Sequence, residues 1–181
     1  GLFVRTLLNL KTLDAGFRPA GVLTMGINPP DGAYQGERLT ALWKDVLARV
    51  ERLPGVRSAT LTTLSPISRA DRGVAIEVAG FSPGSDRDKG IRLNQVSPGY
   101  FQTFGVPLVR GRGFTDADDE TAPKVALLNE AAVRFYFGNR NPLGAQVRFA
   151  QRDQPSQPYE IVGIVKDFRS KTLREADTRT V

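Results

Sequence analysis

The densest cluster of side chains that could do chemistry consists of four carboxylates: Asp116, Asp118, Asp119 and Glu120. Oxygen ligands at alternating positions are typical of a calcium loop, and Asp116, Asp118 and Asp119 could also serve a metal-assisted hydrolase. A calcium loop needs glycine at its sixth position and glutamate at its twelfth, where this sequence has Thr121 and Leu127. A solvated acidic turn accounts for the cluster more simply, so we assign no metal-binding residue.

Nucleophilic catalysis lacks its usual partners, because the sequence contains no histidine and no cysteine. That composition excludes Ser-His and Cys-His pairs, zinc sites of the usual kind and disulfides. Ser65, Ser68 and Ser97 have no histidine to activate them, and no serine is followed three positions later by lysine. Asn129 and Glu130 are explained as a helix N-cap followed by an acid at the positive end of the helix dipole. We assign no catalytic residue and expect that the protein is not an enzyme.

Three glycines could suggest a phosphate-binding loop: Gly105, Gly111 and Gly113. A dinucleotide fingerprint must follow a strand and open a helix, whereas here Arg112 separates two glycines and Phe114-Thr115-Asp116 follows, so no helix N-terminus faces the loop. Turns or a bulge explain the glycines better and give Arg112 a structural role. Phe135, Tyr136 and Phe137 point in different directions on a helix, so core packing explains them better than a stacking platform. No cofactor is assigned.

The composition is that of a folded globular protein, since 40% of the 181 residues are hydrophobic and 24% are charged. The length allows one good core or two small subdomains. The formal net charge is +6, but basic residues are spread along the chain and acidic residues interrupt them. A nucleic-acid-binding surface concentrates its charge, so nucleic acid is not an expected partner. Mild basicity suits equally well a domain beside an anionic lipid surface.

Residues 2–13 have helical spacing and a broad apolar face. The face is typical of a helix that packs on a core, and equally of the outer end of a helix that continues into a membrane. The pattern leaves both interpretations open. The sequence has no uninterrupted apolar run of about 18 residues and no visible secretory signal peptide.

The elements that must position these groups begin with a strand, a helix and a strand. Alternating apolar residues predict a strand over 22–27. Apolar residues at helical spacing predict one long amphipathic helix over 39–53, and a run rich in Val, Thr and Leu predicts a second strand over 56–64. This βαβ unit cannot cover both faces of a sheet by itself, so further elements must join it.

From residue 65 onward the sequence becomes rich in predicted strands, with two short helices. The strands are predicted over 74–78, 91–96, 106–109, 125–128, 146–149 and 159–166, and the helices over 98–104 and 130–137. Ser97 and Asn129 are the expected N-caps of these helices, and Gly105 is expected to close the first. Residues 170–181 turn polar, and together with the unmatched βαβ unit they indicate a fragment of a longer chain.

Short motifs follow one another in a fixed order along nearly the whole sequence. They are Asp14–Pro19, Leu53–Val56, Val96–Phe101, Gly105–Leu108, Gly111–Phe114, Leu128–Ala131, Tyr136–Phe137, Asn141–Gly144 and Ile161–Val165. Each motif is weak alone. As an ordered set they resemble the extracytoplasmic (periplasmic) core domain of MacB/FtsX-type ABC transporter permeases, and most closely the duplicated permeases of Acidobacteria.

The resemblance implies an α+β fold: a partial porter-like (ferredoxin-like) βαβ subdomain with an inserted β-rich, Sabre-like subdomain. It implies a juxtamembrane stalk helix over 1–16 and a porter-like half over 17–68, with 170–181 as its truncated return. The Sabre-like subdomain would then occupy 69–169.

The resemblance also implies a location in the periplasmic part of a cytoplasmic (inner) membrane protein. The domain would be non-catalytic, and would transmit conformational change or bind a substrate or partner for export. Its partners would be the transmembrane helices of the parent permease, a cytoplasmic ABC ATPase, and a periplasmic partner or second permease copy. Tyr100, Phe101 and Phe104 would be largely buried scaffold.

Two other functions stay open. A stand-alone periplasmic ligand-binding module would be favoured by a deep apolar pocket with convergent polar groups. The metal-assisted hydrolase that uses Asp116, Asp118 and Asp119 would be favoured by binding of a divalent cation.

Overall fold

The computed structural model describes Gly16, residues 20–30, 32–65, 72–150 and 157–168, and Thr180. The expected stalk helix over 1–16 and the expected return over 170–181 lie outside the described residues, apart from Gly16 and Thr180. Ser68 lies outside them as well. Within the described part of the chain, no helix has the length and apolar character needed to cross a membrane.

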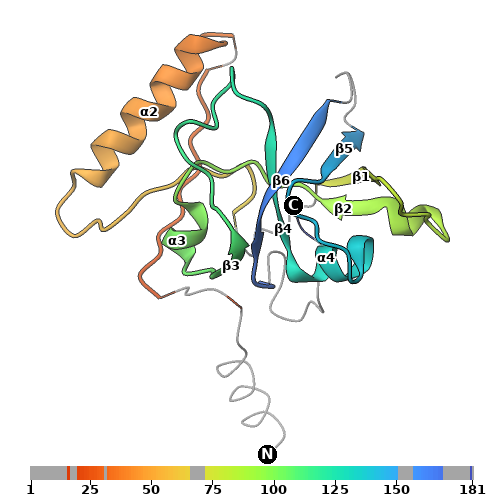
Figure 1. The fold of residues 1–181 in the computed structure, drawn as a ribbon. Coiled ribbons are helices and arrows are strands. Elements are labelled where there is room, and N and C mark those ends of the chain that lie inside the picture. The colour runs from red at the N-terminus through yellow and green to blue at the C-terminus, as the bar shows by residue number, and fades with distance from the viewer. Residues whose placement is uncertain are drawn as a thin grey trace, which may run out of the picture.

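A mixed six-stranded sheet forms the body of the structure (Figure 1). Its strands are β1 (Gly73–Val78), β2 (Gly90–Arg92), β3 (Leu108–Gly111), β4 (Val125–Asn129), β5 (Gln146–Ala150) and β6 (Pro158–Val165). The hydrogen-bonded order is β2-β1-β5-β6-β3, and β4 also pairs with β6. The β4–β6 pair is parallel and the other pairs are antiparallel. A sheet of this kind confirms the predicted α+β class.

Strand β6 is the centre of the sheet, because it pairs with three other strands. Strand β4 runs along it from Glu160 to Val165. The opposite edge is shared, since β5 pairs with Pro158–Glu160 and β3 pairs with Gly163–Val165. A strand that is covered on both faces is typically apolar throughout, and Ile161 packs in one buried cluster while Val162 and Val165 pack in another, which explains the apolar run of residues 161–165.

Helix α4 (Glu130–Phe137) packs on one face of the sheet (Figure 1). Its bounds are those predicted, and the Asn129 side chain accepts a hydrogen bond of 3.1 Å from the Ala132 amide, which confirms Asn129 as the N-cap. Tyr136 and Phe137 are buried in the main core, whereas Phe135 is 40% exposed. The core-packing prediction therefore holds for two of the three adjacent aromatic residues.

A second buried cluster surrounds helix α3 (Tyr100–Phe104) and contains Tyr100, Phe104, Val106, Leu127, Val165 and Phe168. Leu127 belongs to this cluster and Leu128 to the main core, because successive side chains of a strand point to opposite faces. Tyr100 and Phe104 are buried as expected, and Phe101 is partly buried.

The N-cap predicted for α3 is wrong. Gly99, in the left-handed conformation with φ 82°, occupies the position before the helix and provides no side-chain cap. The hydroxyl of Ser97 instead accepts a hydrogen bond of 2.8 Å from the Leu61 amide. Gly105 closes the helix in the left-handed conformation, as predicted.

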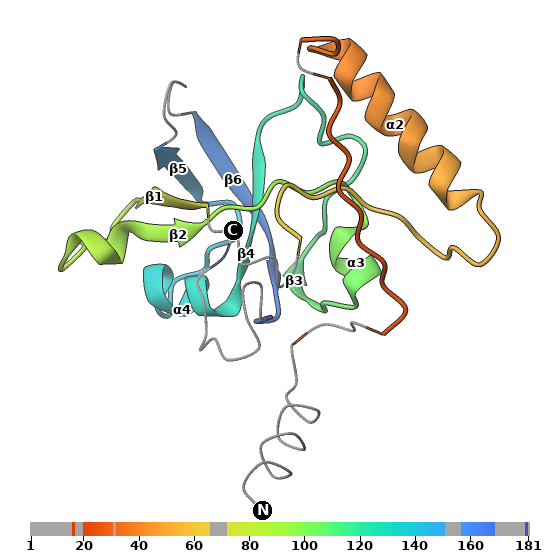
Figure 2. The ribbon, with the colours of Figure 1, turned by 180° about the vertical axis from the view of Figure 1, so that it is seen from behind.

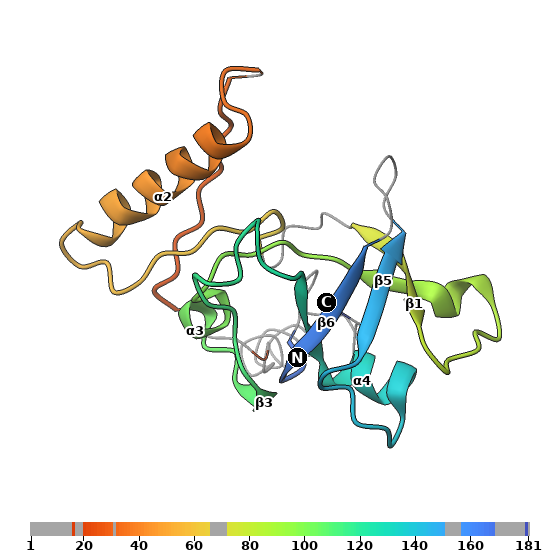
Figure 3. The same ribbon diagram turned by 45° about the horizontal axis from the view of Figure 1, so that its top comes forward.

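Helix α2 (Glu37–Glu51) confirms the long amphipathic helix predicted from the sequence. No residue of α2 is buried, although its apolar stripe is continuous. The helix stands away from the sheet in two further views (Figures 2 and 3). The large apolar residues of α2 are all partly buried, so this face is only partly covered by the described part of the chain.

The strands predicted over 22–27 and 56–64 are wrong. Leu23 is 91% exposed and Met25 is 68% exposed, and the second segment has one isolated bridge, from Thr62 to Val96. A strand needs a neighbour that pairs with its backbone groups, and the described sheet leaves both segments outside. Alternation of apolar residues predicts a suitable strand but not its partner.

Two predicted strands in the β-rich part also differ from the structure. The strand predicted over 91–96 is shortened to β2, because residues 94–97 turn toward 60–64 and pair with them. The strand predicted over 106–109 is displaced to β3, where Gly111 takes part in the pairing. The connection between β1 and β2 contains a short 3-10 helix, Asp86–Lys89.

Candidate functional site

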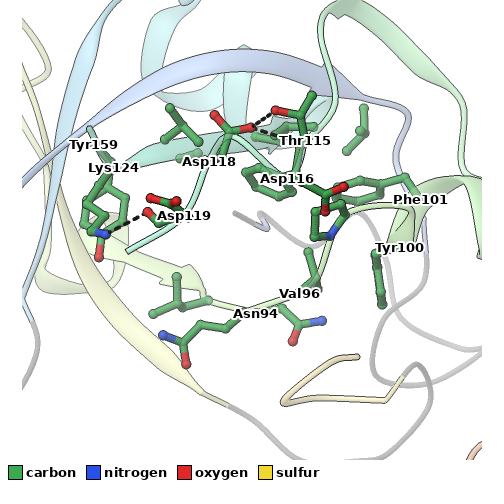
Figure 4. A pocket seen from close by; sticks show the side chains of 18 of the residues that line it. Asn94, Val96, Tyr100, Phe101, Thr115, Asp116, Asp118, Asp119, Lys124 and Tyr159 are labelled. Atoms are coloured by element: carbon green, nitrogen blue, oxygen red, sulfur yellow. Dashed lines mark hydrogen bonds between the residues drawn. The ribbon is translucent and has the colours of Figure 1, made fainter. Parts of the chain in front are cut away.

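A cavity of about 500 Å³ lies between the acidic loop 115–124, the segment 93–98, α3 and the beginning of α2 (Figure 4). Its lining includes apolar and aromatic side chains as well as the four clustered carboxylates. The volume falls in the range of small-molecule sites. No single motif predicts this cavity, because its walls come from segments far apart in the sequence.

Aromatic side chains form one wall of the cavity. The rings of Phe101 and Phe114 stack with centroids 6.4 Å apart, and the Phe168 ring meets Phe101 edge-on at 6.2 Å. Phe101 comes from α3, Phe114 follows β3 and Phe168 follows β6. The sheet and α3 thus bring together three rings that are distant in the sequence.

Asp118 is held by an ion pair with Arg112. The Arg112 guanidinium donates to both carboxylate oxygens, at 2.7 and 2.8 Å, and the Thr115 amide donates to Asp118 at 2.8 Å. The hydrogen bond from Arg112 lowers the pKa of Asp118 to about 2, with further help from Thr115. Both members of this pair therefore have a structural role in shaping the loop.

Asp119 and Glu120 also have partners within the protein. Asp119 accepts hydrogen bonds from the amide and hydroxyl of Thr121, at 2.8 and 2.7 Å, and the Thr121 hydroxyl is the main reason that the pKa of Asp119 is lowered. Glu120 accepts a bond of 2.7 Å from the hydroxyl of Thr40 on α2. The acidic loop is thereby tied to itself and to the beginning of α2.

Asp116 differs from its neighbours. It is exposed, and within the described residues its carboxylate takes part in no hydrogen bond or ion pair. Its side chain and that of Phe101 both line the cavity (Figure 4). In the described ranges, no group of three or more acidic side chains could hold a metal ion. Asp116, Asp118 and Asp119 are close in sequence, but the structure does not gather their carboxylates into a coordination site.

The glycines once considered for phosphate binding serve the backbone instead. Gly111 has φ 75°, and a Cβ atom there would overlap the carbonyl oxygen of Val162. A Cβ atom on Gly163 would likewise overlap the carbonyl oxygen of Arg112. These two glycines allow β3 and β6 to approach closely at the bulge, whereas a Cβ atom on Gly113 would meet nothing within 4 Å.

A polar junction connects residues 60–64 with residues 94–97. The Asn94 side chain accepts from the Leu64 amide at 3.0 Å and donates to the Leu64 carbonyl at 3.1 Å. The Ser97 hydroxyl bonds the Leu61 amide at 2.8 Å and the Thr60 hydroxyl at 2.9 Å. Side chain and backbone bonds together make this connection specific in register.

Tyr100, the first residue of α3, also contacts the polar junction through its phenol. Burial raises the pKa of its phenol to about 12, although hydrogen bonds with Thr62 and Asn94 act in the opposite direction. The phenol therefore stays protonated in the folded protein under ordinary conditions. It is part of the same polar group of side chains as Asn94.

The sequence analysis missed Asp167, which joins three parts of the fold. Its Oδ1 accepts from Asn129 Nδ2 and from the Ala131 amide, both at 2.7 Å, and its Oδ2 accepts from Arg134 at 2.7 Å. The sequence feature that could have indicated this role is the position of Asp167 just after the apolar run of β6, at the carboxyl end of that strand. This contact is structural and lies at the beginning of α4.

Comparison with known proteins places these features in a wider group. The family model described as "MacB-like periplasmic core domain" matches residues 10–179. The macrolide export ATP-binding/permease protein MacB of Aggregatibacter actinomycetemcomitans is 37% identical over 68 residues, which are 38% of this chain and 10% of that protein. The protein of the same name from Mannheimia succiniciproducens is 35% identical over 75 residues, which are 41% of this chain and 11% of that protein.

A solved structure has a similar fold. The crystal structure of the periplasmic region of MacB from Actinobacillus actinomycetemcomitans gives a TM-score of 0.53 at 24% identity. The match covers 71% of this chain and 52% of that chain. The chain thus spans about half of this solved region and about a tenth of the two curated relatives.

Proposed function

Because the chain belongs to the family of MacB-like periplasmic core domains, we propose that it is the extracytoplasmic core domain of an ABC transporter permease. It acts outside the cytoplasmic membrane and without catalysis. Its partners are the transmembrane helices of the parent permease and a cytoplasmic ABC ATPase. Support for these partners comes from the two curated relatives, whose names describe ATP-binding/permease proteins.

The proposed division of the chain keeps the boundaries expected from the sequence. A stalk helix over 1–16 leads to a porter-like half over 17–68, to which 170–181 return, and a Sabre-like subdomain occupies 69–169. The six strands all lie between Gly73 and Val165, which supports the β-rich part. The apolar stripe of α2, which the described residues cover only in part, supports an incomplete porter-like half, because a continuous apolar stripe normally packs fully on a core.

The polar junction supports our proposal that the domain transmits conformational change. Residues 60–64 belong to the porter-like half and residues 94–97 to the Sabre-like subdomain. Two backbone bonds, from Thr63 to Gln95 and from Ser97 to Leu61, run beside the bonds of Asn94 and Ser97. A connection with this many directional bonds resists sliding, so movement of one part is passed to the other.

The cavity favours a second role, binding of a substrate or partner for export. It has apolar walls and polar groups at one side, which is the usual make-up of a ligand site. A stand-alone periplasmic binding module would have the same cavity but would need no junction and no stalk. The two roles are compatible in one permease domain.

Transport and ATP hydrolysis, measured together, test the transmission role. The full-length protein that contains this chain is reconstituted in liposomes with its ATPase, and a macrolide is the first substrate to try, since two relatives are named for macrolide export. The double variant Asn94→Ala, Ser97→Ala is expected to hydrolyse ATP but to transport poorly. Ser85→Ala, which removes an exposed hydroxyl far from the junction, is the matched control. Equal transport by the junction variant and the control would show that the junction does not transmit motion.

A further inference from the structure

The cavity has a chemical asymmetry that indicates what it can hold. Among the described residues, four carboxylates line it, together with the ammonium groups of Lys44 and Lys124. Lys124 Nζ donates to the backbone carbonyl of Glu120 at 2.8 Å, and Arg112 pairs with Asp118. The described groups at this side of the cavity thus carry a small net negative charge, while the remaining walls are mostly apolar.

The carboxylates are not equivalent toward a ligand. Arg112 neutralises Asp118, and backbone and hydroxyl donors occupy Asp119. Glu120 accepts a bond from Thr40. Asp116 is the carboxylate that keeps both oxygens available within the described residues, and it lines the same cavity as Phe101 (Figure 4).

We propose that this cavity binds an organic cation with an apolar body, whose charged nitrogen pairs with Asp116. A cavity lined by a carboxylate and by aromatic rings suits such a ligand, because the carboxylate pairs with the charge and aromatic rings attract cations as well. The apolar body lies against Phe101, Phe114 and Val96, where its burial supplies most of the affinity.

An anionic ligand would find a less suitable site. It would lie against the unpaired carboxylate of Asp116, and Lys124 is already engaged with backbone carbonyls. A neutral apolar ligand would gain affinity from contact with the apolar walls but none from Asp116. The proposal therefore distinguishes ligands of similar size by their charge.

Binding to the purified full-length protein that contains this chain, in the absence of ATP, tests this inference without any transport step. It rests on the proposed function only for the origin of the ligand, so failure of binding and failure of transmission are separate results. The probe is rhodamine 6G, a cation with an apolar ring system, followed by fluorescence anisotropy. The comparison probe is 8-anilinonaphthalene-1-sulfonate, an apolar anion.

We expect saturable binding of rhodamine 6G that weakens as salt is raised, and weaker binding of the anionic probe. Asp116→Asn is expected to raise the dissociation constant of rhodamine 6G by about fivefold, the size of one partly exposed ion pair. The matched control is Asp86→Asn, which removes an exposed carboxylate on the β1–β2 connection. Circular dichroism of each variant verifies that it is folded.

Two results would overturn the proposal. One is equal affinity of the native chain and Asp116→Asn for rhodamine 6G. The other is absence of saturable binding by the folded native chain, which would mean that the cavity is filled by part of the protein itself. Tighter binding of the anionic probe than of rhodamine 6G would reject the assigned ligand charge.

Discussion

Asn129 Nδ2 donates a hydrogen bond of 2.7 Å to Asp167 Oδ1, across 38 positions of the sequence. The same carboxylate accepts from the Ala131 amide at the first turn of α4 and pairs with Arg134. Asn129 ends β4, and Asp167 follows β6 by two residues. This pair therefore fixes the beginning of α4 relative to the parallel strands β4 and β6.

Replacement of Asp167 should destabilise the fold. Asp167→Ala leaves the Asn129 amide group and the Ala131 amide without their acceptor, and we expect the free energy of unfolding to fall by about 2 kcal/mol. Urea unfolding followed by circular dichroism measures the change. Asp86→Ala, which removes an exposed ion pair, should change it by less than about 0.5 kcal/mol. Equal unfolding midpoints for the two variants would contradict the role of Asp167.

The close approach of β3 and β6 predicts a contrast between two glycines only two positions apart. Gly111→Ala places a Cβ atom at positive φ and against the Val162 carbonyl, and should destabilise by about 3 kcal/mol. Gly113→Ala meets no atom within 4 Å and should stay within about 0.5 kcal/mol of the native chain. Thermal and urea unfolding of both variants provide the comparison. A reversed order would mean that β3 does not lie against β6 as described.

The buried phenol of Tyr100 predicts a specific loss of stability in alkali. Its pKa is about 12 in the folded protein and 10.0 for an ordinary tyrosine, so the unfolded chain loses this proton first as pH rises. The stability that the neutral phenol contributes is fully present below pH 10 and is lost as pH rises through 12. The loss amounts to about 3 kcal/mol.

Substitution separates this effect from other alkaline titrations. Tyr100→Phe should unfold with a shallower dependence on pH between 10 and 12, whereas Tyr34→Phe, at an exposed position, should keep the native dependence. The measurement is the free energy of unfolding in urea at several pH values. Parallel curves for Tyr100→Phe and the native chain would contradict the burial of this phenol.

The acidic loop is expected not to bind divalent cations. Asp118 is paired with Arg112, and Asp119 accepts its hydrogen bonds from Thr121 and Ala122. Titration with calcium, magnesium and manganese should release no heat, and the melting temperature should not rise. A saturable heat signal that disappears in Asp116→Asn would instead favour the metal-assisted hydrolase.

Local patterns in the sequence were sufficient for elements that carry their own signals. The stripe of α2 and the Asn129 cap of α4 predicted those helices, and the apolar runs predicted β4 and β6. The segments 22–27 and 56–64 had equally good local patterns and yet form no strand. Strand formation depends on a partner, and local alternation carries no information about one.

The candidate site was harder to predict than the fold. Its carboxylates were recognised, but the partners that distinguish Asp116 from Asp118 lie in other segments, such as Arg112 on the preceding turn. The junction of Asn94 and Ser97 with residues 60–64 was not expected at all, because Ser97 was assigned to a helix cap. These contacts depend on how the chain folds back on itself, which residue types and spacing do not specify.

We claim that the junction holds the proposed porter-like half and the proposed Sabre-like subdomain in one fixed relation. The chain contains no cysteine, so Arg57→Cys and Asn139→Cys, both at exposed positions, place two spin labels without interference. Double electron–electron resonance between them should give one narrow distance distribution, and the added changes Asn94→Ala and Ser97→Ala should broaden it. A distribution that is already broad with an intact junction, or that the two changes leave narrow, would contradict the claim.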